Sequence, residues 1–351
     1  MKFLLYGANG YTGQLIAEMA KDYHVTPILA GRSADKIQPL AERLGYAYRI
    51  FDLKDTAALD AALQEVDVVL HAAGPFVHTA RPMMEACLRT GTHYLDITGE
   101  IAVFEIAAAL DAKAQSAGIV LMPGVGFDVV PTDCLALFLH QQLPDATHLK
   151  LAFVPLGRGG GMSQGTATTM AENLGSGGAI RQNGKIVPVP LGHDTLRLPH
   201  EGKELLAMSI PWGDVSTAFY TTGIPNITVY TGVRPKAYKM VQRQRYFNWL
   251  LRLPFVRAYV KRQIKKRPPG PTPEQLEKGT TLVWGEVSNA AGQSQRAMMH
   301  TASGYKLTAI AALLITRRVL EGAGLRGFHT PAGAFGADLI MEVPGTEREL
   351  L

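Results

Sequence analysis

Three glycines near the amino terminus have a spacing that lets a polypeptide backbone wrap around a phosphate. Gly7, Gly10 and Gly13 lie between an apolar run over residues 2–6 and a helical pattern over residues 14–21. In this position glycine permits a tight turn, close approach to a pyrophosphate and close helix packing, while the helix start offers free N–H groups. The pattern favours a dinucleotide-binding loop over a purely structural turn. The other expected cofactor contacts in this loop are Asn9, Tyr11 and Thr12.

The residues after the second apolar run indicate which dinucleotide is bound. An NAD-binding fold usually places an acidic residue about 20 positions after the glycines, where it binds the ribose 2′-hydroxyl. Here Arg32 and Ser33 take that place, and Lys36 follows one helical turn later. A guanidinium donates several hydrogen bonds to a phosphate, so these residues predict the 2′-phosphate of NADP(H). The alternative is that Arg32 is a solvated charge after a strand.

Further cofactor contacts are expected where the next strands end. Asp52 and Leu53 follow the third apolar run, and we expect them to border the adenine. The fourth run ends in the small residues Ala73, Gly74 and Pro75, where the backbone can approach the ribose and the nicotinamide. Both interpretations depend on a parallel sheet, because ligands in such sheets lie outside the carboxyl ends of the strands.

Candidate proton donors follow the fifth and sixth apolar runs. Hydride transfer needs little covalent chemistry from a protein, but reduction needs a proton. Tyr94 and Asp96 lie at the end of the fifth run and Glu100 follows it, and Asp128 and Asp133 follow the sixth. Each has capping or turn formation as its alternative role. The sequence shows no metal-ligand cluster, no G-x-S-x-G elbow and no Tyr-x-x-x-Lys pair near the expected place.

Two later segments carry further candidates. Tyr305 and Lys306 begin a long apolar helical pattern and could reach back toward the nicotinamide, with Tyr305 as a catalytic candidate and Lys306 as a substrate contact. The glycine-rich residues 159–165 precede another helix, where Ser163 and Thr166 are natural N-cap residues. Alternatively, Ser163 and Thr166 bind a substrate carbonyl, carboxylate or phosphate at that helix start.

The elements that must position these residues alternate in type along the first third of the chain. Apolar runs over residues 2–6, 25–30, 47–51, 66–72, 92–96 and 118–122 alternate with helical patterns, one of them over residues 103–115. Such alternation predicts an α/β fold with a doubly wound Rossmann sheet. The later Gly- and Pro-rich part predicts a second α+β domain on a mostly antiparallel sheet. The expected domains are residues 1–131, 132–302 and 303–351, the last packing back at the interdomain cleft.

Composition limits the class of protein. With 47% hydrophobic and 19% charged residues over 351 positions, the chain favours two packed domains over disorder. Cys87 and Cys134 lack a metal-binding spacing and are expected to be buried. No signal peptide or membrane-spanning run is apparent, so we expect a cytoplasmic protein.

The basic residues are concentrated in one segment. Twelve Lys and Arg lie between Asp214 and Glu274, with no acidic residue among them, and the rest of the chain holds 23 basic and 30 acidic residues. Residues 246–266 mix these cations with aromatic and aliphatic side chains, and Pro254 interrupts a helix expected across residues 242–266. One interpretation is peripheral membrane or acyl-carrier contact. The alternative is a helix covering the second domain or forming a dimer contact. Nucleic-acid binding is not expected, because no recognition motif accompanies the charge.

Several motifs together resemble the saccharopine dehydrogenase-like family of NADP-binding oxidoreductases. The matching pieces are residues 7–13, 30–33, 73–76, 91–100, 126–133, 270–274, 304–305 and 330–336. The sequence is most similar to the branch of trans-acting enoyl reductases and saccharopine dehydrogenase-like oxidoreductases. No cluster of cations suited to an amino-diacid is apparent, so a true saccharopine dehydrogenase is not expected.

The resemblance implies an NADPH-dependent oxidoreductase. Its expected substrate is a small molecule or acyl group with an enoyl, carbonyl or imine function, which could be lipid-linked. The alternative is a catalytically silent NADP(H)-binding sensor or scaffold, and a homodimer is compatible with either. From the residues we nominate Asp128, Tyr94 and Tyr305 for catalysis.

Overall fold

The computed structural model describes residues 1–156 and 161–351 and divides the chain into two compact units. The first unit contains Met1–Val130 and Tyr305–Ala334, and the second contains Pro131–Gly304 and Phe335–Leu351. Each unit therefore draws on two separate stretches of the chain. Gly159 and Gly160 of the glycine-rich loop lie outside the described residues.

A seven-stranded sheet organises the first unit, and every pair of neighbouring strands is parallel. The strand order β15-β6-β5-β4-β1-β2-β3 reverses between β1 and β4, as in a doubly wound Rossmann sheet. The predicted fold is confirmed, with one added edge strand, β15. The strands are β1 (Lys2–Tyr6), β2 (Thr26–Gly31), β3 (Tyr48–Ile50), β4 (Val68–His71), β5 (His93–Asp96), β6 (Val120–Met122) and β15 (Gly327–Phe328).

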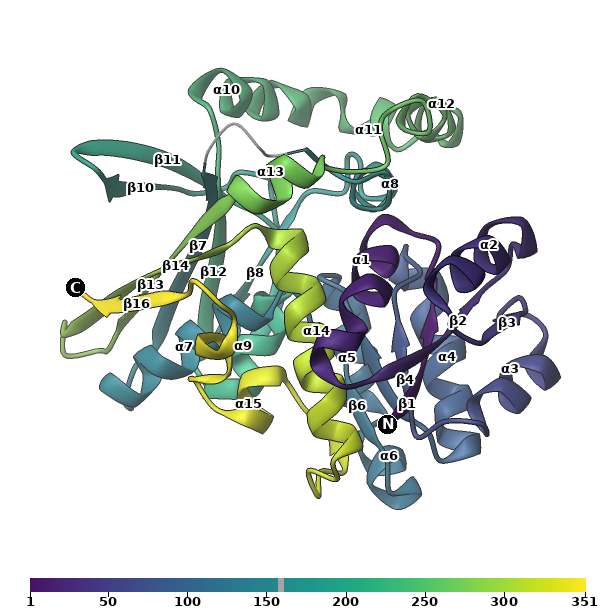
Figure 1. Cartoon of the computed structure of the whole chain (residues 1–351). Helices are drawn as coiled ribbons and strands as arrows, with labels where there is room; N and C mark the ends of the chain where they lie inside the picture. Colours follow the sequence, from purple (N-terminus) through teal and green to yellow (C-terminus); the bar gives the residue numbers. More distant parts are fainter. Residues whose placement is uncertain (157–160) are drawn as a thin grey trace. The chain divides into compact units, whose positions relative to one another are not determined.

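Helices connect these strands and cover the sheet, as Figure 1 shows. They are α1 (Tyr11–Met19), the short 3-10 helix η1 (Ala20–Tyr23), α2 (Ala34–Leu44), α3 (Thr56–Leu63), α4 (Phe76–Thr90), α5 (Ile101–Ala109), α6 (Asp111–Ala117) and α14 (Gly304–Leu320). Apolar residues of the strands form one core with α3, α4 and α5. Helix α14 is mostly buried, which explains why its pattern is apolar on nearly every side.

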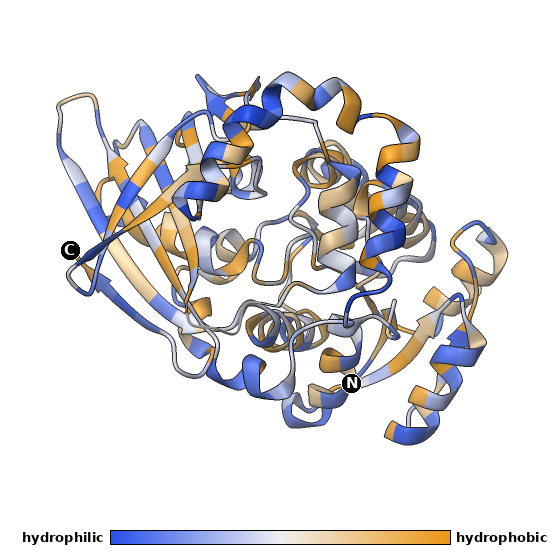
Figure 2. Cartoon of the chain, turned by 90° about the horizontal axis from the view of Figure 1, so that it is seen from above, coloured by the Kyte–Doolittle hydropathy of each residue, from blue (hydrophilic) through white to orange (hydrophobic). Residues whose placement is uncertain are grey.

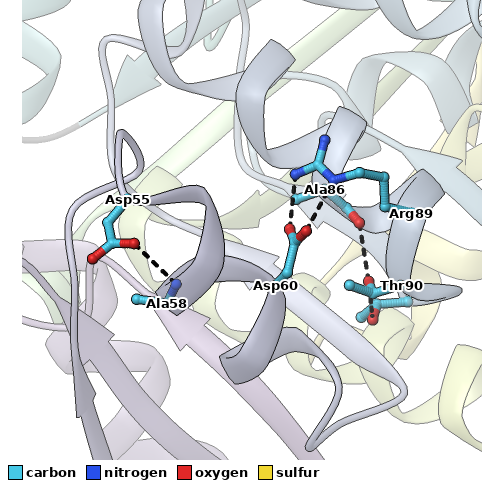
Figure 3. Close-up of polar contacts among 7 residues, drawn as sticks. Asp55, Ala58, Asp60, Ala86, Arg89 and Thr90 are labelled. Atoms are coloured by element: carbon cyan, nitrogen blue, oxygen red, sulfur yellow. Dashed lines mark hydrogen bonds and ion pairs between the residues drawn. The ribbon is translucent and has the colours of Figure 1, made fainter.

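One polar contact caps α3 and another joins it to α4 (Figure 3). The Asp55 carboxylate accepts the Ala58 N–H at 3.1 Å and so caps α3. Arg89 donates two hydrogen bonds, of 2.9 and 2.7 Å, to the carboxylate of Asp60, which joins α4 to α3. Such paired geometry orients both side chains more firmly than a single contact would.

The helix expected over residues 103–115 is divided at Leu110, where the backbone leaves the helical region (φ −92°, ψ 0°). Asp111 begins α6, and its carboxylate accepts the N–H of Phe328 in β15 at 2.7 Å. The partner comes from the far end of the chain. The expectation of one continuous helix was therefore wrong, and the second helix begins at a residue that makes a long-range contact.

A nine-stranded sheet organises the second unit and is mostly antiparallel, with β12 and β7 as its parallel pair. Hydrophobic and hydrophilic residues alternate along its strands (Figure 2), as expected for a sheet with one covered face. The strands are β7 (His148–Leu156), β8 (Gly178–Gln182), β9 (Lys185–Val189), β10 (Thr195–His200), β11 (Lys203–Ser209), β12 (Asn226–Gly232), β13 (Thr280–Ser288), β14 (Ser294–Ala302) and β16 (Glu347–Leu350).

The second unit also contains most of the shorter helices. They are α7 (Val130–Gln142), α8 (Gln164–Glu172), α9 (Asp214–Thr222), α10 (Pro235–Gln244), η2 (Arg245–Phe247), α11 (Asn248–Leu251), α12 (Pro254–Ile264), α13 (Pro273–Lys278), α15 (Pro331–Phe335, at the boundary of the units) and η3 (Leu339–Glu342). The helix expected across residues 242–266 is interrupted at Pro254, as predicted. Pro254 lacks an N–H and holds Leu253 in an extended conformation, so a new helix starts there.

Two expectations about burial and hydropathy can be compared with the structure. Cys87 and Cys134 are both fully buried and unpaired, as expected, and burial raises the pKa of each thiol. Of the helices in the described residues, none combines the length and apolar character needed to cross a membrane.

Candidate functional site

The glycine-rich loop follows β1 and leads into α1, as predicted. Gly7 has a φ of +89°, and a Cβ there would lie 2.8 Å from the backbone of Ala72 and Ala73 at the end of β4. A Cβ on Gly13 would lie 2.5 Å from the Gly7 carbonyl oxygen, so α1 packs directly on the loop. Gly10 is the N-cap residue of α1. The loop thus has the close backbone packing that a dinucleotide-binding turn requires.

Arg32 and Ser33 lie just beyond the end of β2. The Arg32 side chain is 74% exposed, and its Nη1 lies 3.8 Å from Oδ2 of Asp52. Such an exposed pair contributes little to stability, which leaves the guanidinium able to bind another anion. Ser33 is the N-cap residue of α2, but its side chain makes no capping hydrogen bond. Leu53 follows Asp52 and is half-buried.

The turn after β4 is held by a residue from a different strand end. Oε1 of Glu100 accepts the Phe76 N–H at 2.8 Å, and Oε2 accepts the Val77 N–H at 2.9 Å. Glu100 therefore caps α4 and fixes the turn that contains Ala73, Gly74 and Pro75. A carboxylate at a helix start is also favoured by the helix dipole. The sequence suggested Glu100 as a proton donor, but this geometry makes it a positioning residue.

Asp96 is a fully buried carboxyl group at the end of β5. It accepts hydrogen bonds from the Tyr94 hydroxyl at 2.5 Å and from the N–H groups of Thr98 and Gly124, each at 2.9 Å. Burial raises the pKa of Asp96 to about 7 although these hydrogen bonds oppose the shift. Tyr94 is fully buried, and its hydroxyl contacts Asp96. This arrangement favours a positioning role for Tyr94 rather than direct contact with a substrate.

Asp128 lies in the loop between β6 and α7 and is half-buried. It packs on Gly99, where a Cβ would lie 2.8 Å from Asp128 Oδ2, so glycine is needed for this approach. Burial, and secondarily the negative charge of Glu100, raise the pKa of Asp128 to about 7. A carboxyl group with this pKa can both hold and release a proton near neutral pH.

The helix α14 returns from the C-terminal part of the chain to the glycine-rich loop. The ring of Tyr305 meets the ring of Tyr11 edge to face, with 5.2 Å between their centroids. Thr308, one turn further along, accepts the Phe127 N–H through its Oγ1 at 3.0 Å, next to Asp128. Within the first unit, Tyr305 thus contacts Tyr11, and the same helix binds the residue next to Asp128. Lys306 is half-buried beside Tyr305.

Ser163 and Thr166 lie in the second unit. Ser163 is the N-cap of α8, and its Oγ accepts the Thr166 N–H at 3.1 Å, so the expected capping role is confirmed. Their contact with a substrate stays a prediction. Asp133, another acidic candidate, accepts a hydrogen bond from Thr221 at 2.5 Å within the same unit.

His71 is a polar residue that the sequence analysis did not single out. It ends β4 and is fully buried among the rings of Tyr6, Phe76 and Tyr94. Thr79 uses its proton to bond the Ala73 carbonyl, so it accepts from His71 Nε2, and burial lowers the His71 pKa to about 3. A neutral imidazole thus supports the turn after β4. Its place at the predicted end of a strand was a signal that could have identified it.

The described residues can be compared with known proteins. Residues 3–122 match the family model described as the saccharopine dehydrogenase NADP binding domain. The chain is similar to saccharopine dehydrogenase-like oxidoreductases and to trans-acting enoyl reductases. NADP(H) is accordingly its cofactor. No group of three or more His, Cys, Asp or Glu in the described ranges is arranged to hold a metal ion.

The relatives of this chain differ in how much of it they share. The "Saccharopine dehydrogenase-like oxidoreductase" of Rattus norvegicus is 27% identical over 216 residues, covering 54% of this chain and 50% of the relative. The chain thus spans about half the length of that relative. The "Trans-acting enoyl reductase" of Mycobacterium tuberculosis (strain ATCC 25618 / H37Rv) is 25% identical over 97% of this chain and 95% of the relative. The protein of the same name from Mycobacterium leprae (strain TN) is 33% identical over 40% of the chain and 35% of the relative.

A solved structure supports the fold of this chain over its whole length. Saccharopine dehydrogenase (L-Glu forming) from Saccharomyces cerevisiae superposes with a TM-score of 0.69, covering 100% of this chain and 99% of the other. The two sequences are 13% identical. At this identity the similarity concerns the fold and not the substrate.

The described residues fit NADP(H). The closely packed glycines leave no room for side chains where the pyrophosphate would meet the backbone, and α1 starts there with its N-terminal dipole. Arg32 and Ser33 lie at the strand end whose residues contact the ribose 2′ group in Rossmann folds. A carboxylate at that place would repel a phosphate, whereas the exposed guanidinium attracts it.

Proposed function

We propose that this protein is an NADPH-dependent reductase of an enoyl, carbonyl or imine group, in which Asp128 supplies the proton. The observation that carries the proposal is the place of Asp128. A half-buried carboxyl group with a pKa of about 7 follows β6, at the carboxyl edge of the sheet that holds the cofactor loop. Bound NADPH supplies the hydride for the reduction.

Asp128 is a better proton donor than its acidic neighbours. Glu100 holds two backbone N–H groups of α4, and Asp96 accepts three hydrogen bonds while fully buried. For Asp128 the charge of Glu100 and partial burial keep the carboxyl protonated up to about pH 7. It gives this proton to the reduced substrate and takes another from solvent, which requires the accessibility that Asp96 lacks.

The start of α14 completes the proposed site. Tyr305 holds Tyr11 in the cofactor loop through the ring contact, and Lys306 follows as the proposed contact for a substrate oxygen. A cation near a carbonyl oxygen stabilises the negative charge that develops there during reduction. In the second unit, Ser163 and Thr166 remain proposed substrate contacts at the start of α8.

The names of the relatives support an enoyl substrate over an amino-diacid. The relatives that align over nearly the whole chain are named trans-acting enoyl reductases. Their names also favour an acyl or lipid-linked substrate over the substrate of a true saccharopine dehydrogenase. We therefore place enoyl thioesters first among the substrates to be tested.

The experiment follows NADPH absorbance with enoyl-CoA, enal and imine substrates. We expect turnover with at least one class, and Asp128→Asn should lower kcat by about 100-fold or more. Asp22→Asn, an exposed carboxyl change in the same unit, is the control and should keep full activity. Tight NADPH binding without turnover of any substrate would instead support an NADP(H)-binding sensor or scaffold.

A further inference from the structure

A run of short helices over residues 235–264 in the second unit carries an unusual surface. The run consists of α10, η2, α11 and α12 and lies within the acid-free segment between Asp214 and Glu274. Its cations lie on α10, η2 and α12, and Arg252 is the C-cap residue of α11. The basic residues of the acid-free segment are Arg234, Lys236, Lys239, Arg243, Arg245, Arg252, Arg257, Lys261, Arg262, Lys265, Lys266 and Arg267.

Large aromatic side chains of the same run point to solvent. Trp249 is 68% exposed, Phe255 67% and Tyr259 63%, although such residues are usually among the most buried. Met240, Tyr246 and Phe247 are also exposed. Figure 2 shows hydrophobic residues beside hydrophilic ones along these helices. Exposed aromatic side chains among so many cations are typical of a surface that binds a partner.

The opposite side of α12 holds the run in place. Val260 and Ile264 pack against Ala167 and Ala171 of α8. Three cations add polar contacts to this side: Arg252 donates to the Gly175 carbonyl at 2.9 Å, Arg257 donates to the Leu174 carbonyl at 2.8 Å, and Lys261 pairs with Glu172. The exposed aromatic residues are therefore not needed to attach the helices to the unit.

A hollow of about 340 Å³ lies at the junction of α10 and η2. It is lined by Lys239, Gln242, Arg243, Arg245 and Tyr246. The guanidinium of Arg245 lies 4.8 Å from the ring centre of Tyr246 and donates to its hydroxyl at 2.6 Å. Within the described ranges, none of the three cations has an acidic partner. The hollow is thus suited to an anionic group such as a phosphate.

We propose that residues 235–264 dock this protein on an anionic phospholipid membrane. Trp249, Phe255 and Tyr259 enter the headgroup boundary, where amphipathic rings are stable, and the cations bind lipid phosphates. This attachment is peripheral. A second copy of the chain fits less well, because a symmetric contact through this surface would place the cations opposite their own equivalents.

The test is co-sedimentation of the full chain with vesicles. One set contains phosphatidylcholine alone, and the other contains phosphatidylcholine with phosphatidylserine. We expect at least tenfold stronger binding to the anionic set and loss of most of it at high salt, because exposed charges are screened. Absence of binding under every condition, or equal binding to both sets, overturns the proposal.

Two variants separate the aromatic from the ionic contribution. Trp249→Ser with Tyr259→Ser, and separately Lys239→Glu with Arg243→Glu, should each weaken binding at least fivefold. The controls are Tyr220→Ser and Lys185→Glu with Lys203→Glu, which change comparably exposed residues elsewhere in the unit and should leave binding unchanged. Circular dichroism and NADPH binding verify that every variant is folded.

Two results with these variants would contradict docking of this surface on a membrane. Unchanged vesicle binding by both the aromatic and the charge variant, with folding verified, overturns the role of this surface. The same conclusion follows if size-exclusion chromatography shows a lipid-free dimer that the Trp249 variant abolishes while vesicle binding is absent. In that case the surface joins two copies of the chain.

Discussion

Glu100 caps the start of α4, because one oxygen of its carboxylate accepts the N–H of Phe76 at 2.8 Å and the other accepts the N–H of Val77 at 2.9 Å. One side chain after β5 thereby shapes the turn after β4, which faces the cofactor in a Rossmann fold. The same carboxylate raises the pKa of Asp128. Glu100 thus links the shape of the cofactor turn to the protonation of the proposed donor.

Removal of the Glu100 carboxylate should loosen α4. We expect Glu100→Ala to lower the free energy of unfolding by about 1–3 kcal/mol, because two backbone donors lose a charged acceptor. Glu100→Gln keeps one acceptor oxygen and should cost less. Chemical denaturation followed by circular dichroism measures both. Glu85→Ala, on the exposed side of the same helix, should cost less than about 0.5 kcal/mol; equal losses at both positions would contradict the cap.

The ring of Tyr305 should matter for cofactor binding more than its hydroxyl does. Loss of an edge-to-face pair costs about 0.5–1.5 kcal/mol, so Tyr305→Ala should weaken NADPH binding up to about tenfold. Tyr305→Phe keeps the ring and should leave the Kd unchanged in a fluorescence titration. If Tyr305→Phe instead lowers kcat at an unchanged Kd, the hydroxyl itself contacts the reacting atoms.

Arg32 should determine the preference for NADPH over NADH. Loss of charged hydrogen bonds to the 2′-phosphate costs about 1.5–3 kcal/mol, so Arg32→Ala should weaken NADPH binding about 10- to 100-fold with little effect on NADH. Arg32→Asp should reverse the preference. Arg43→Ala, whose exposed side chain pairs with Glu18, is the control. Equal affinity of the native chain for NADH and NADPH would refute the phosphate assignment.

Activity should fall as the pH rises through about 7. The proposed donor must be protonated, and its pKa is raised from 3.8 to about 7, so the active form dominates below that pH. We expect kcat/KM to drop about tenfold per pH unit above it, and Asp128→Asn should remove this decline along with most of the activity. A native profile that is flat between about pH 6 and 9 would exclude Asp128 as the donor.

The raised pKa of Asp128 also predicts how the stability of the fold changes with pH. A carboxyl whose pKa is raised in the folded protein favours folding fully at low pH, and this contribution is lost as the pH rises through about 7. Asp128→Asn removes the buried charge, so it should raise Tm relative to the native chain more at about pH 9 than at about pH 5. Thermal unfolding at the two pH values tests this without any substrate.

The cofactor half of the site was predicted from residues whose chemistry is local in the sequence. The loop glycines, Arg32 and Ser33 are close neighbours in the chain or follow the ends of strands whose apolar runs are plain. Glu100 and Asp96 were noticed as acidic residues, but their partners lie on other elements. The sequence therefore suggested proton donors where the structure has a cap and a buried acceptor.

The second unit was harder to predict for a different reason. Strands β8 and β9 are short, and their residues are more often half-buried than exposed or buried, so neither a strict alternation nor an apolar run marks them. Strand β15 has two residues and is defined only by pairing with β6. Helices in the basic segment could be predicted from its composition. Which side chains they expose, Trp249 and Phe255 among them, depends on the face that packs against α8.

The pairing of Gly327 with Val120 also bears on the order in which the protein can fold during synthesis. Strand β6 leaves the ribosome early, but its edge partner and the helix that carries Tyr305 follow only after nearly the whole second unit has been made. Until then an unpaired strand edge is exposed, and contacts of such long sequence separation form slowly. A fragment of residues 1–130 should therefore aggregate, and chaperones have the longest time to act on the part of the chain that is made first.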